Sequence, residues 1–428
     1  MTTSASTVVI HPYVKRRSDS GVRSPDASLE EAVRLAHAID LEVTEGFIVA
    51  LQKLTPATLM GKGKVEEIGS YIKQAEANLA IINHTLSPVQ QRNLEKAWDC
   101  KVIDRTALIL EIFGARARTH EGKLQVELAA LEYQKSRLVR SWTHLERQRG
   151  GFGFMGGPGE SQIEIDRRLI RDRIAKIKRQ LEDVTRTREL HRKVRRDTPY
   201  PVVALVGYTN AGKSTLFNRL TGANVLSMDK LFATLDPTMR VLELPSGAKI
   251  ILSDTVGFVS DLPTELVAAF RATLEEVLEA DILLHVRDVS HPDSEAQKRD
   301  VENVLLGLFK GTALPENLIE VFNKADRLEP EVKEALHEKN ALLISAIQGT
   351  GIEHLFDIIE GRMREQFYQV IHCRVPVTDG KTLAWLHAHG KVMEQRLEED
   401  YIHLIVQLSP DNIQRLKRMG SHVSHQHA

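Results

Sequence analysis

A phosphate-binding loop set between an apolar strand and a helix constrains the fold of this chain more than any other feature. Residues 207–214 read Gly-Tyr-Thr-Asn-Ala-Gly-Lys-Ser, the apolar run Val202–Val206 precedes them, and Ser214–Asn218 begins a predicted helix. The backbone amides of such a loop surround phosphates, its lysine reaches the outer phosphates, and its serine places a hydroxyl on Mg²⁺. This order predicts an α/β fold with a P-loop nucleotide site. The expected contacts are Gly207, Tyr208, Thr209, Asn210, Ala211, Gly212, Lys213 and Ser214.

Three short motifs follow the loop in a fixed order, and each comes directly after an apolar run. The motifs are Asp254-Thr255-Val256-Gly257, Asn323-Lys324-Ala325-Asp326 and Ser345-Ala346-Ile347, and the runs are Lys249–Leu252, Leu318–Phe322 and Ala341–Ile344. Ligands bind at the carboxyl ends of parallel strands, where such motifs meet. Each motif alone could be a polar turn, and a P-loop alone could serve ATP as easily as GTP. The four together predict one guanine-nucleotide site.

The Asn-Lys-Ala-Asp motif explains why guanine is expected rather than adenine. The Asp326 carboxylate can accept two hydrogen bonds, from the ring N–H and the exocyclic amine of guanine. Adenine lacks this donor pair and would leave a buried carboxylate unpaired. Asn323 can hydrogen-bond the imidazole edge of the base, Lys324 can lay its aliphatic stem over the ring, and Ala346 can offer its backbone N–H to the guanine carbonyl.

These motifs resemble those of the HflX family, within the Obg–HflX group of translational GTPases. The resemblance rests on residues 207–214, on Leu-Phe-Ala-Thr-Leu-Asp-Pro-Thr at 231–238, on Asp-Thr-Val-Gly-Phe at 254–258 and on the glycine-rich segment 150–159. It extends from about Val33 to the end of the predicted GTPase domain. It implies a cytoplasmic, Mg²⁺-dependent GTPase that converts GTP to GDP and phosphate and binds the large ribosomal subunit. Some members of the family split stalled or stressed ribosomes.

The same resemblance assigns roles within the nucleotide site. Thr234 is implied to be the switch I threonine that reaches Mg²⁺ and the γ-phosphate, and Asp254 the switch II aspartate of the Mg²⁺ shell. Lys213 and Thr234 are the expected catalytic residues, and Ser214 and Thr234 the expected metal ligands. The switch I residues expected to contact the nucleotide are Phe232, Ala233, Thr234, Leu235 and Asp236.

At two positions the sequence differs from the pattern expected of a GTPase domain. Many GTPases carry a glutamine after the switch II glycine to orient the attacking water, but Phe258 stands there and cannot hydrogen-bond water. We therefore expect slow intrinsic hydrolysis that ribosomes or their large subunit stimulate. Arg287 ends the apolar run Asp281–Val286, where a buried arginine would need a partner carboxylate such as Asp288 or Asp254.

Composition indicates a chain that works in a reducing compartment. Its 428 residues suffice for two to four domains. Cys100 and Cys373 lie far apart and show no metal-binding spacing. No apolar run reaches the roughly 20 residues of a membrane span, and residues 1–24 lack the apolar core of a signal peptide. We expect a cytoplasmic protein with no transmembrane segment, and a monomer whose nucleic-acid partner is RNA, not DNA.

Basic charge is concentrated in one segment of the chain. The formal net charge is -1, yet residues 135–196 hold 18 Lys and Arg against 8 Asp and Glu. Such asymmetry predicts a local contact with a polyanion. By the resemblance, that polyanion is ribosomal RNA.

The basic segment belongs to a region with two apolar stripes spaced by three and four residues, each with one break, at Lys135 and at Arg167. The stripes are Leu124, Leu128, Leu131, Leu138, Trp142 and Leu145, then Ile163, Ile170, Ile174, Ile177, Leu181 and Val184. They mirror each other about position 154 and predict an antiparallel helical hairpin about 45 Å long. Its turn, 150–159, holds six glycines with Phe152 and Phe154. We expect the two rings to stack on unpaired RNA bases, although a flexible tip without a contact is the alternative.

The N-terminal region alternates helical and strand patterns, which predicts a small βαβ domain with a mostly parallel sheet. Within it, Gly61-Lys62-Gly63-Lys64 opens one helix and either binds phosphate or RNA or is a helix-start turn. The predicted segments are a disordered tail (1–24), an N-terminal α/β domain (25–116), a basic helical hairpin (117–196), a GTPase domain (197–369), a small C-terminal α+β domain (370–420) and a tail (421–428).

Three other functions share parts of this pattern. An ATP-driven RNA-remodelling enzyme is disfavoured by Asn323 and Asp326 and by the lack of a second motor domain in the sequence. A non-catalytic RNA-binding scaffold is disfavoured by the intact Lys213, Ser214 and Thr234. An assembly factor that acts on immature subunits would carry the same motifs, so the sequence leaves that alternative open.

Overall fold

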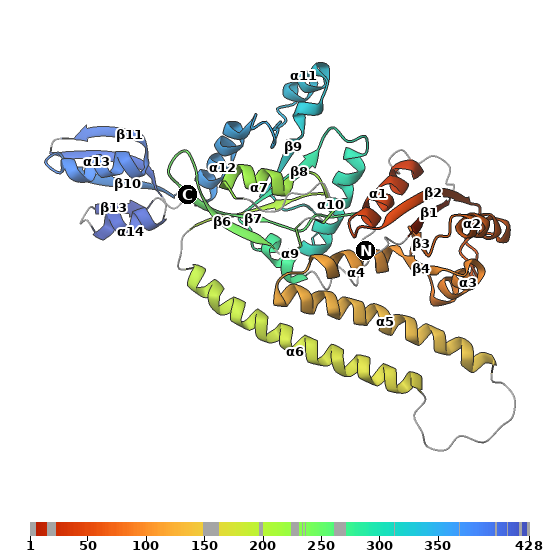
Figure 1. The fold of residues 1–428 in the computed structure, drawn as a ribbon. Coiled ribbons are helices and arrows are strands. Elements are labelled where there is room, and N and C mark those ends of the chain that lie inside the picture. The colour runs from red at the N-terminus through yellow and green to blue at the C-terminus, as the bar shows by residue number, and fades with distance from the viewer. Residues whose placement is uncertain are drawn as a thin grey trace.

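The computed structural model describes most of the chain. The residues outside the description are 1–5, 15–22, 149–161, 197–199, 224–230, 233, 236, 261–270, 312, 368, 399, 409, 419–421 and 426–428. Three sheets follow one another along the molecule, with the P-loop domain between the N-terminal and C-terminal domains (Figure 1). None of the helices built from described residues is both long enough and apolar enough to cross a membrane.

The N-terminal domain is a four-stranded parallel sheet with helices on both faces. The strand order is β2-β1-β3-β4, so the predicted parallel sheet is confirmed. Alternate residues of β1 pack on opposite faces: Val9 joins the core beneath α1 and α4, whereas Val8 and Ile10 join the core beneath α2 and α3. The elements are β1 Ser6–Val14, α1 Pro25–His37, β2 Glu42–Leu51, α2 Lys62–Gln74, β3 Leu79–Ile82, α3 Pro88–Trp98, β4 Lys101–Asp104 and α4 Arg105–Arg116.

The prediction of a disordered tail over residues 1–24 is wrong for Ser6–Val14, which form β1 between β2 and β3. Val8, Val9 and Ile10 are completely buried. A strand covered on both faces shows a continuous apolar run instead of an alternating pattern. This apolar run is short and Pro12 interrupts it, so the sequence alone gave little indication of a strand here. Arg23 also lies in the supposed tail, and its side chain contacts the P-loop domain.

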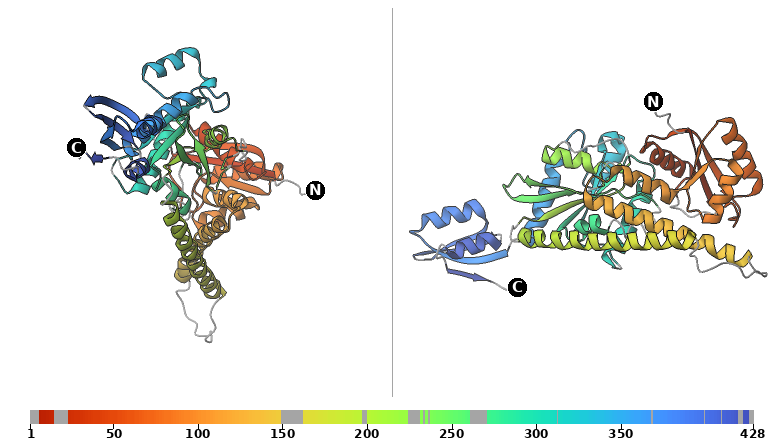
Figure 2. Two further views of the ribbon diagram at one scale, coloured as in Figure 1. Left: turned by 90° about the vertical axis from the view of Figure 1, so that its left-hand side faces the viewer. Right: turned by 60° about the horizontal axis from the view of Figure 1, so that its bottom comes forward.

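Two long helices connect the N-terminal and P-loop domains: α5, His120–Gln148, and α6, Gln162–Arg196. Figure 1 shows that the two helices lie side by side and run antiparallel, and ion pairs from Arg173 to Glu127 and from Lys178 to Glu132 join them. Ile174 and Ile177, both from the predicted apolar stripe, are buried. Figure 2 shows both helices running alongside the N-terminal and P-loop domains. The glycine-rich turn, with Phe152 and Phe154, lies outside the described residues.

The P-loop domain is built on a five-stranded sheet of order β6-β7-β5-β8-β9, parallel except for β6. The predicted strand Ala341–Ile344 is reduced to one bridge between Leu343 and Phe322. The strands are β5 Val202–Val206, β6 Thr238–Glu243, β7 Lys249–Asp254, β8 Ile282–Asp288 and β9 Leu318–Asn323; the helices are α7 Lys213–Thr221, α9 Arg271–Leu278, α10 Ser294–Phe309, the 3₁₀ turn η1 Ala325–Arg327, α11 Pro330–Glu338 and α12 Ile352–Phe367.

Arg287, at the end of β8, is buried, but neither of the predicted carboxylates pairs with it. Its guanidinium reaches Glu295 at 2.5 Å and also pairs with Glu320 of the neighbouring strand β9. Burial alone would lower the pKa of Arg287, but the two carboxylates hold it above its usual value. The arginine is therefore compensated across the sheet, at contacts that a single sequence does not reveal.

The C-terminal domain is a four-stranded sheet of order β11-β12-β10-β13 with two helices. Ile371, Leu404 and Leu416 are among the residues of its separate core. The prediction of a tail over 421–428 is wrong for β13, which pairs antiparallel with β10. The elements are β10 Gln369–Pro376, α13 Gly380–His389, β11 Lys391–Glu398, β12 Tyr401–Leu408, α14 Pro410–Arg418 and β13 His422–His425.

Candidate nucleotide-binding site

The P-loop follows β5 and wraps tightly against its neighbours. Gly207 has φ 151°, and a Cβ there would lie 2.2 Å from the carbonyl oxygen of Val286 on the adjacent strand. Gly212 has φ 94° and is the residue before α7. Both positions require glycine, because a side chain would meet neighbouring atoms and the backbone is in a region that L-residues avoid. The loop therefore leads through Gly212 directly into the N-terminus of α7, the kind of position where anions bind.

Lys213 is buried inside the loop. Its Nζ donates to the carbonyl oxygens of Tyr208 at 2.9 Å and Gly207 at 3.1 Å. Burial lowers the pKa of Lys213 to about 8, against the opposing effect of Asp254. A lysine held by carbonyls at the mouth of the loop can turn to phosphate oxygens with little movement of the backbone.

Three oxygen side chains converge beside the P-loop, and they are the predicted metal-site residues. Ser214 Oγ donates to Asp254 Oδ2 at 2.7 Å, Thr234 Oγ1 donates to the same oxygen at 2.9 Å, and the two hydroxyls lie 2.9 Å apart. They come from α7, switch I and the end of β7. The structure thus brings together residues 20 to 40 positions apart in the chain.

The donor set fits a hard divalent cation. Hydroxyl and carboxylate oxygens are the ligands that Mg²⁺ takes at phosphate-binding sites. The second carboxylate oxygen of Asp254, Oδ1, is buried without a hydrogen-bond partner among the described residues. Burial raises the pKa of Asp254 above its usual value, although Ser214 and Lys213 oppose the shift. A cation at this position would supply the positive charge that the buried carboxylate needs.

The remaining switch residues are mostly held by packing. Phe232 and Leu235 are buried. Thr255 Oγ1 donates to the carbonyl of Leu205 at 2.5 Å, which fixes switch II to β5. Val256 is buried, and Gly257 approaches the P-loop so closely that a Cβ would lie 2.9 Å from Lys213 Nζ. The predicted contacts Ala233 and Asp236 lie outside the described residues.

Asn323 joins the base-recognition motif to two other loops. Its Nδ2 donates to the carbonyl of Ala211 at 2.8 Å, and its Oδ1 accepts from the backbone N–H of Ala346 at 3.0 Å. One amide hydrogen of Asn323 remains for the imidazole edge of a base. The Ala346 N–H, predicted to face the guanine carbonyl, is directed at Asn323 in this structure.

The Asp326 carboxylate is held in place by Ser345, another residue predicted to belong to the nucleotide site. Ser345 Oγ donates to Asp326 Oδ1 at 2.5 Å, which leaves the other carboxylate oxygen to accept from a base. Lys324, in the left-handed conformation at φ 62°, pairs with Asp288 at 2.7 Å. Ala325 is buried, whereas Ile347 is largely exposed. The three motifs, which follow β7, β9 and the single bridge at Leu343, therefore converge on one rim of the sheet.

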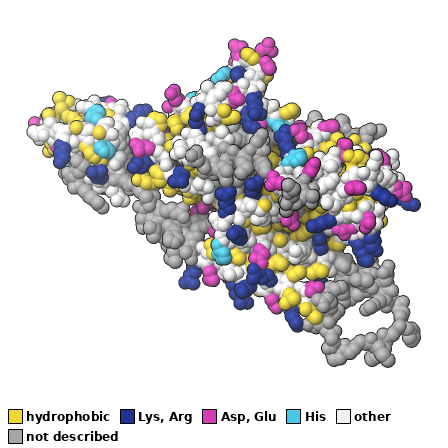
Figure 3. Space-filling view, in the orientation of Figure 1, with side chains coloured by type: hydrophobic (Ala, Val, Ile, Leu, Met, Phe, Trp, Pro, Cys, Tyr) yellow, Lys and Arg dark blue, Asp and Glu magenta, His cyan; other side chains and the backbone are white. Residues whose placement is uncertain are grey.

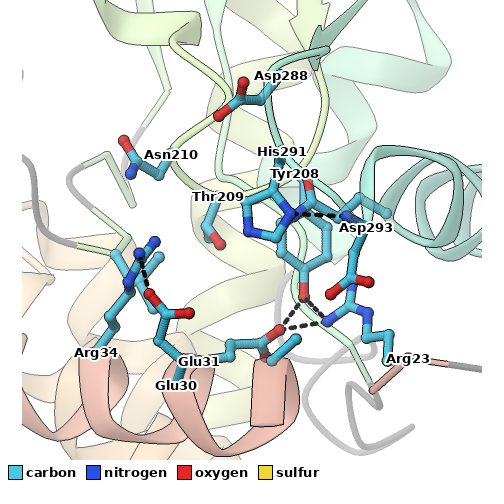
Figure 4. A pocket seen from close by; sticks show the side chains of 13 residues that line it. Arg23, Glu30, Glu31, Arg34, Tyr208, Thr209, Asn210, Asp288, His291 and Asp293 are labelled. Atoms are coloured by element: carbon cyan, nitrogen blue, oxygen red, sulfur yellow. Dashed lines mark hydrogen bonds and ion pairs between the residues drawn. The ribbon is translucent and has the colours of Figure 1, made fainter. Parts of the chain in front are cut away.

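Tyr208 differs from the other P-loop residues, because its side chain points to the N-terminal domain. Its hydroxyl donates to Glu31 of α1 at 2.5 Å and accepts from Arg23 at 2.7 Å (Figure 4). Burial, then the charge of Glu31, raises the pKa of Tyr208. Sequence reasoning missed Glu31, Arg23 and Arg105 in this cluster. No local motif marks them, since each also reaches a partner in the P-loop domain more than 150 residues further along the chain.

The glycine- and lysine-rich segment of the N-terminal domain has the geometry of a helix start. Gly61 is the residue before α2, and Lys62 and Lys64 pair with Glu66 and Glu67 of the same helix. Pairing within the helix accounts for both lysines without a ligand.

Family models match nearly the whole chain. A model described as GTP-binding GTPase N-terminal matches residues 26–114, and one described as GTP-binding GTPase Middle Region matches 116–195. A model described as 50S ribosome-binding GTPase matches 202–324, and one described as HflX C-terminal domain matches 331–428.

Curated relatives are similar over most of their length. The chain is 54% identical over 393 residues to a GTPase HflX from Magnetococcus marinus, which covers 91% of this chain and 90% of that protein. It is 42% identical over 398 residues to GTPase HflX from Escherichia coli, covering 92% and 91%. A solved GTP-binding protein from Sulfolobus solfataricus, in complex with GDP, is 24% identical with a TM-score of 0.44, covering 84% and 99%. With a P-loop GTPase fold and these relatives, the chain belongs to the HflX family of GTPases and hydrolyses GTP.

Proposed function

We propose that this GTPase is a Mg²⁺-dependent switch that binds the large ribosomal subunit and splits stalled or stressed ribosomes, acting as a cytoplasmic monomer. The observation that carries the proposal is the exposed basic face of α6, a helix that packs along α5 beside the nucleotide domain. Arg168, Arg171, Lys176 and Arg179 are exposed on it. Figure 3 shows Lys and Arg side chains on the face near α5 and α6, with a few acidic side chains among them. Such a face suits phosphates of ribosomal RNA.

Not every arginine of the hairpin serves this contact. Arg137, which lies within the basic segment 135–196, binds Asp104 at 2.6 Å in the N-terminal domain. Arg173 pairs with Glu127. The RNA contact is therefore assigned to the outer face of α6 and to the glycine-rich tip. We propose that Phe152 and Phe154 of the tip, outside the described residues, stack on unpaired bases.

The nucleotide contacts predicted from the sequence form the second part of the proposal. Bound Mg²⁺ would neutralise charge on the outer phosphates. Ser214 and Thr234 would hold the Mg²⁺ ion. Asp254 would orient these two hydroxyls and face the coordination shell of the ion. Lys213 would bind the outer phosphates, and Asp326 the guanine. The predicted domain limits are kept as part of the same proposal, with β1 added to the N-terminal domain and β13 to the C-terminal domain.

Hydrolysis in varied Mg²⁺ tests the metal assignment. Ser214→Ala and Thr234→Ala should raise the Mg²⁺ concentration needed for half-maximal GTP turnover. Thr221→Ala is a matched control, because this hydroxyl caps its own helix by donating to the carbonyl of Phe217 at 2.7 Å. An unchanged Mg²⁺ requirement in both site variants would contradict the assignment.

Sedimentation with purified ribosomes tests the partner. Wild-type protein should bind the large subunit with a non-hydrolysable GTP analogue and much less with GDP, and binding should fall steeply with salt. Arg171→Glu with Arg179→Glu should abolish binding while GTP affinity stays unchanged. Lys339→Glu, an exposed charge reversal at the end of α11, is the control. Binding that survives the double reversal would place the contact elsewhere.

Replacing residues 150–159 by a short Gly-Ser turn tests the tip. GTP binding should be kept, whereas stimulation of hydrolysis by ribosomes and splitting of ribosomes should fall sharply. If splitting is normal, the tip is only a turn. If only immature subunits stimulate hydrolysis, the protein acts in assembly and the splitting role is wrong.

A further inference from the structure

Helix α4 of the N-terminal domain contacts both switch segments, and it connects them to the long helix α5. We propose that α4 and the buried carboxylate of Glu31 position switch I and switch II for GTP hydrolysis. Glu31 and Arg105 would then be positioning residues of the GTPase reaction, although neither lies in the GTPase domain. This inference rests on GTP hydrolysis itself and not on the proposed ribosomal partner.

The first turn of α4 binds switch II. Arg105 Nη2 donates to both the carbonyl oxygen and the hydroxyl of Ser260, each at 2.9 Å. The same nitrogen reaches Glu31 at 2.5 Å, and the Ser260 hydroxyl donates to Glu31 at 2.9 Å. Ser260 stands two residues after Phe258, in the segment that responds to the γ-phosphate. Switch II is thus held by a carboxylate and an arginine of another domain.

The P-loop shares this network through Tyr208. Its hydroxyl donates to Glu31 at 2.5 Å and accepts from the backbone N–H of Ser260 at 2.8 Å. Arg23 completes the cluster by donating to Tyr208 at 2.7 Å (Figure 4) and to Asp300 at 2.8 Å. One hydroxyl therefore links the phosphate-binding loop, switch II and the N-terminal domain.

The network is buried, so a partial loss of its contacts is unfavourable. The side chains of Glu31 and Arg105 are only 10% and 7% exposed. Burial alone would raise the pKa of Glu31, but Arg105 and Arg23 hold it below its usual value. Removing one partner from such a cluster leaves a buried charge uncompensated. The cluster should therefore exist either complete or disassembled, as a switch requires.

The last turn of α4 packs on switch I. Phe113 meets Phe232 edge to face, with ring centroids 4.6 Å apart at 78°, and both rings are buried. Phe232 lies two residues before Thr234, whose hydroxyl sits at the candidate metal site. One rigid helix therefore fixes points near both Thr234 and Ser260.

The residue before the helix connects it to the long helix α5. Asp104 is fully buried and caps α4 through the N–H of Ala107 at 2.9 Å. It also accepts from Arg137 at 2.6 Å and from the hydroxyl of Tyr133 at 2.7 Å, both on α5. Asp104 and Arg105 are chain neighbours, so a displacement of α5 is carried to switch II through one peptide unit.

The position of Thr234 determines whether loss of the Glu31 cluster should weaken binding of a GTP analogue or of GDP. Thr234 lies within hydrogen-bonding distance of Ser214 and Asp254, as a switch I threonine does when it closes on metal and γ-phosphate. The Glu31 cluster is complete in this same arrangement. Breaking the cluster should therefore weaken binding of a GTP analogue relative to GDP.

The test uses the full chain without ribosomes. For Glu31→Gln, affinity for a non-hydrolysable GTP analogue should fall about fivefold or more, with GDP affinity within about twofold. Single-turnover hydrolysis should slow as well. Glu30→Gln is the matched control, because Glu30 is exposed on the same helix and, among the residues that the structure describes, forms its ion pair along that helix with Arg34. Equal losses for GDP and the analogue, or no loss, would overturn the inference.

A second variant guards against misfolding. Tyr208→Phe removes only the hydroxyl, and it should show the same selective loss with an unchanged far-ultraviolet circular dichroism spectrum. If Glu31→Gln does not fold, the affinities of Tyr208→Phe for the GTP analogue and for GDP test the inference instead. Arg137→Met breaks the link to α5. It should leave the analogue-to-GDP ratio unchanged and lower any stimulation by large subunits. Stimulation of hydrolysis depends on the proposed ribosomal partner, whereas the ratio of analogue affinity to GDP affinity does not. The proposed partner and the proposed role of α4 and Glu31 can therefore fail separately.

Discussion

Asn323 Nδ2 donates to the backbone carbonyl of Ala211 at 2.8 Å, so the base-recognition motif is tied directly to the P-loop. Gly212 follows with φ 94°, and a Cβ there would lie 2.2 Å from that same nitrogen. Gly212→Ala should strain the backbone and displace Asn323. We expect GTP binding to weaken about tenfold or more, measured by titration calorimetry.

Gly222 provides the matched control for this substitution. It also has a left-handed backbone, at φ 63°, but nothing lies within 4 Å of its Cβ position. Gly222→Ala should therefore lower stability slightly and leave GTP affinity nearly unchanged. Equal losses of affinity in the two variants would show that backbone strain alone is responsible and that the Asn323 contact is unimportant.

Exchange of Asp326 for asparagine should change the preferred base. Xanthine carries a carbonyl where guanine has its amine, and the new amide can donate to it. GTP affinity should fall about 100-fold, because each charge-assisted hydrogen bond contributes about 1.5–3 kcal/mol, and affinity for xanthosine triphosphate should rise. Ser345→Ala, which frees the Asp326 carboxylate, should weaken GTP binding without changing the base preference. An unchanged preference in Asp326→Asn means that this carboxylate does not read the base.

The buried Lys213 predicts proton uptake on nucleotide binding. Its pKa is lowered to about 8 by burial, so above that pH the free protein carries mostly neutral lysine. Phosphates favour the charged form and raise the pKa again. Binding at about pH 8.5 should take up about three-quarters of a proton, and binding at about pH 6.5 almost none. Calorimetry in buffers of different ionisation enthalpy measures this uptake, and Lys213→Arg should abolish it. Equal uptake at the two pH values would contradict the assignment.

Thr209 is the side chain we expect to help orient the attacking water. Phe258 is buried, and the Thr209 hydroxyl is buried without a hydrogen-bond partner among the described residues. A Cβ on Gly257 would lie 2.9 Å from both Thr209 Cα and Lys213 Nζ, so Thr209 borders the outer-phosphate position. Thr209→Val should slow single-turnover hydrolysis about tenfold with little change in GTP affinity. Thr209→Ser should retain the rate, and a normal rate in Thr209→Val would rule the hydroxyl out.

The nucleotide site was predictable because its motifs are local. The segments that hold Lys213, Asp254 and Asn323 are contiguous and each follows a strand, so the sheet alone brings these three residues to one rim. The α/β fold, the parallel N-terminal sheet and the two long helices follow from periodicity in the same way. Nucleotide contacts of individual residues remain predictions.

The contacts between domains were not predictable. Glu31, Arg105 and Ser260 form one cluster, yet each stands alone in its own stretch of sequence. Single polar residues on a helix look the same whether they face solvent or another domain. The partners of Arg287 were missed for the same reason, because Glu320 is a neighbour only through strand pairing.

The position of β1 has a consequence for synthesis of the chain. This strand is synthesised before β2 and β3, with which it pairs and whose residues follow only after position 41 and position 78. Until then Val8-Val9-Ile10, which is buried in the folded protein, is an unpaired, β-prone segment of the nascent polypeptide. During translation the strand must therefore be kept from pairing elsewhere, which makes it the expected binding site for chaperones that meet new chains as they emerge.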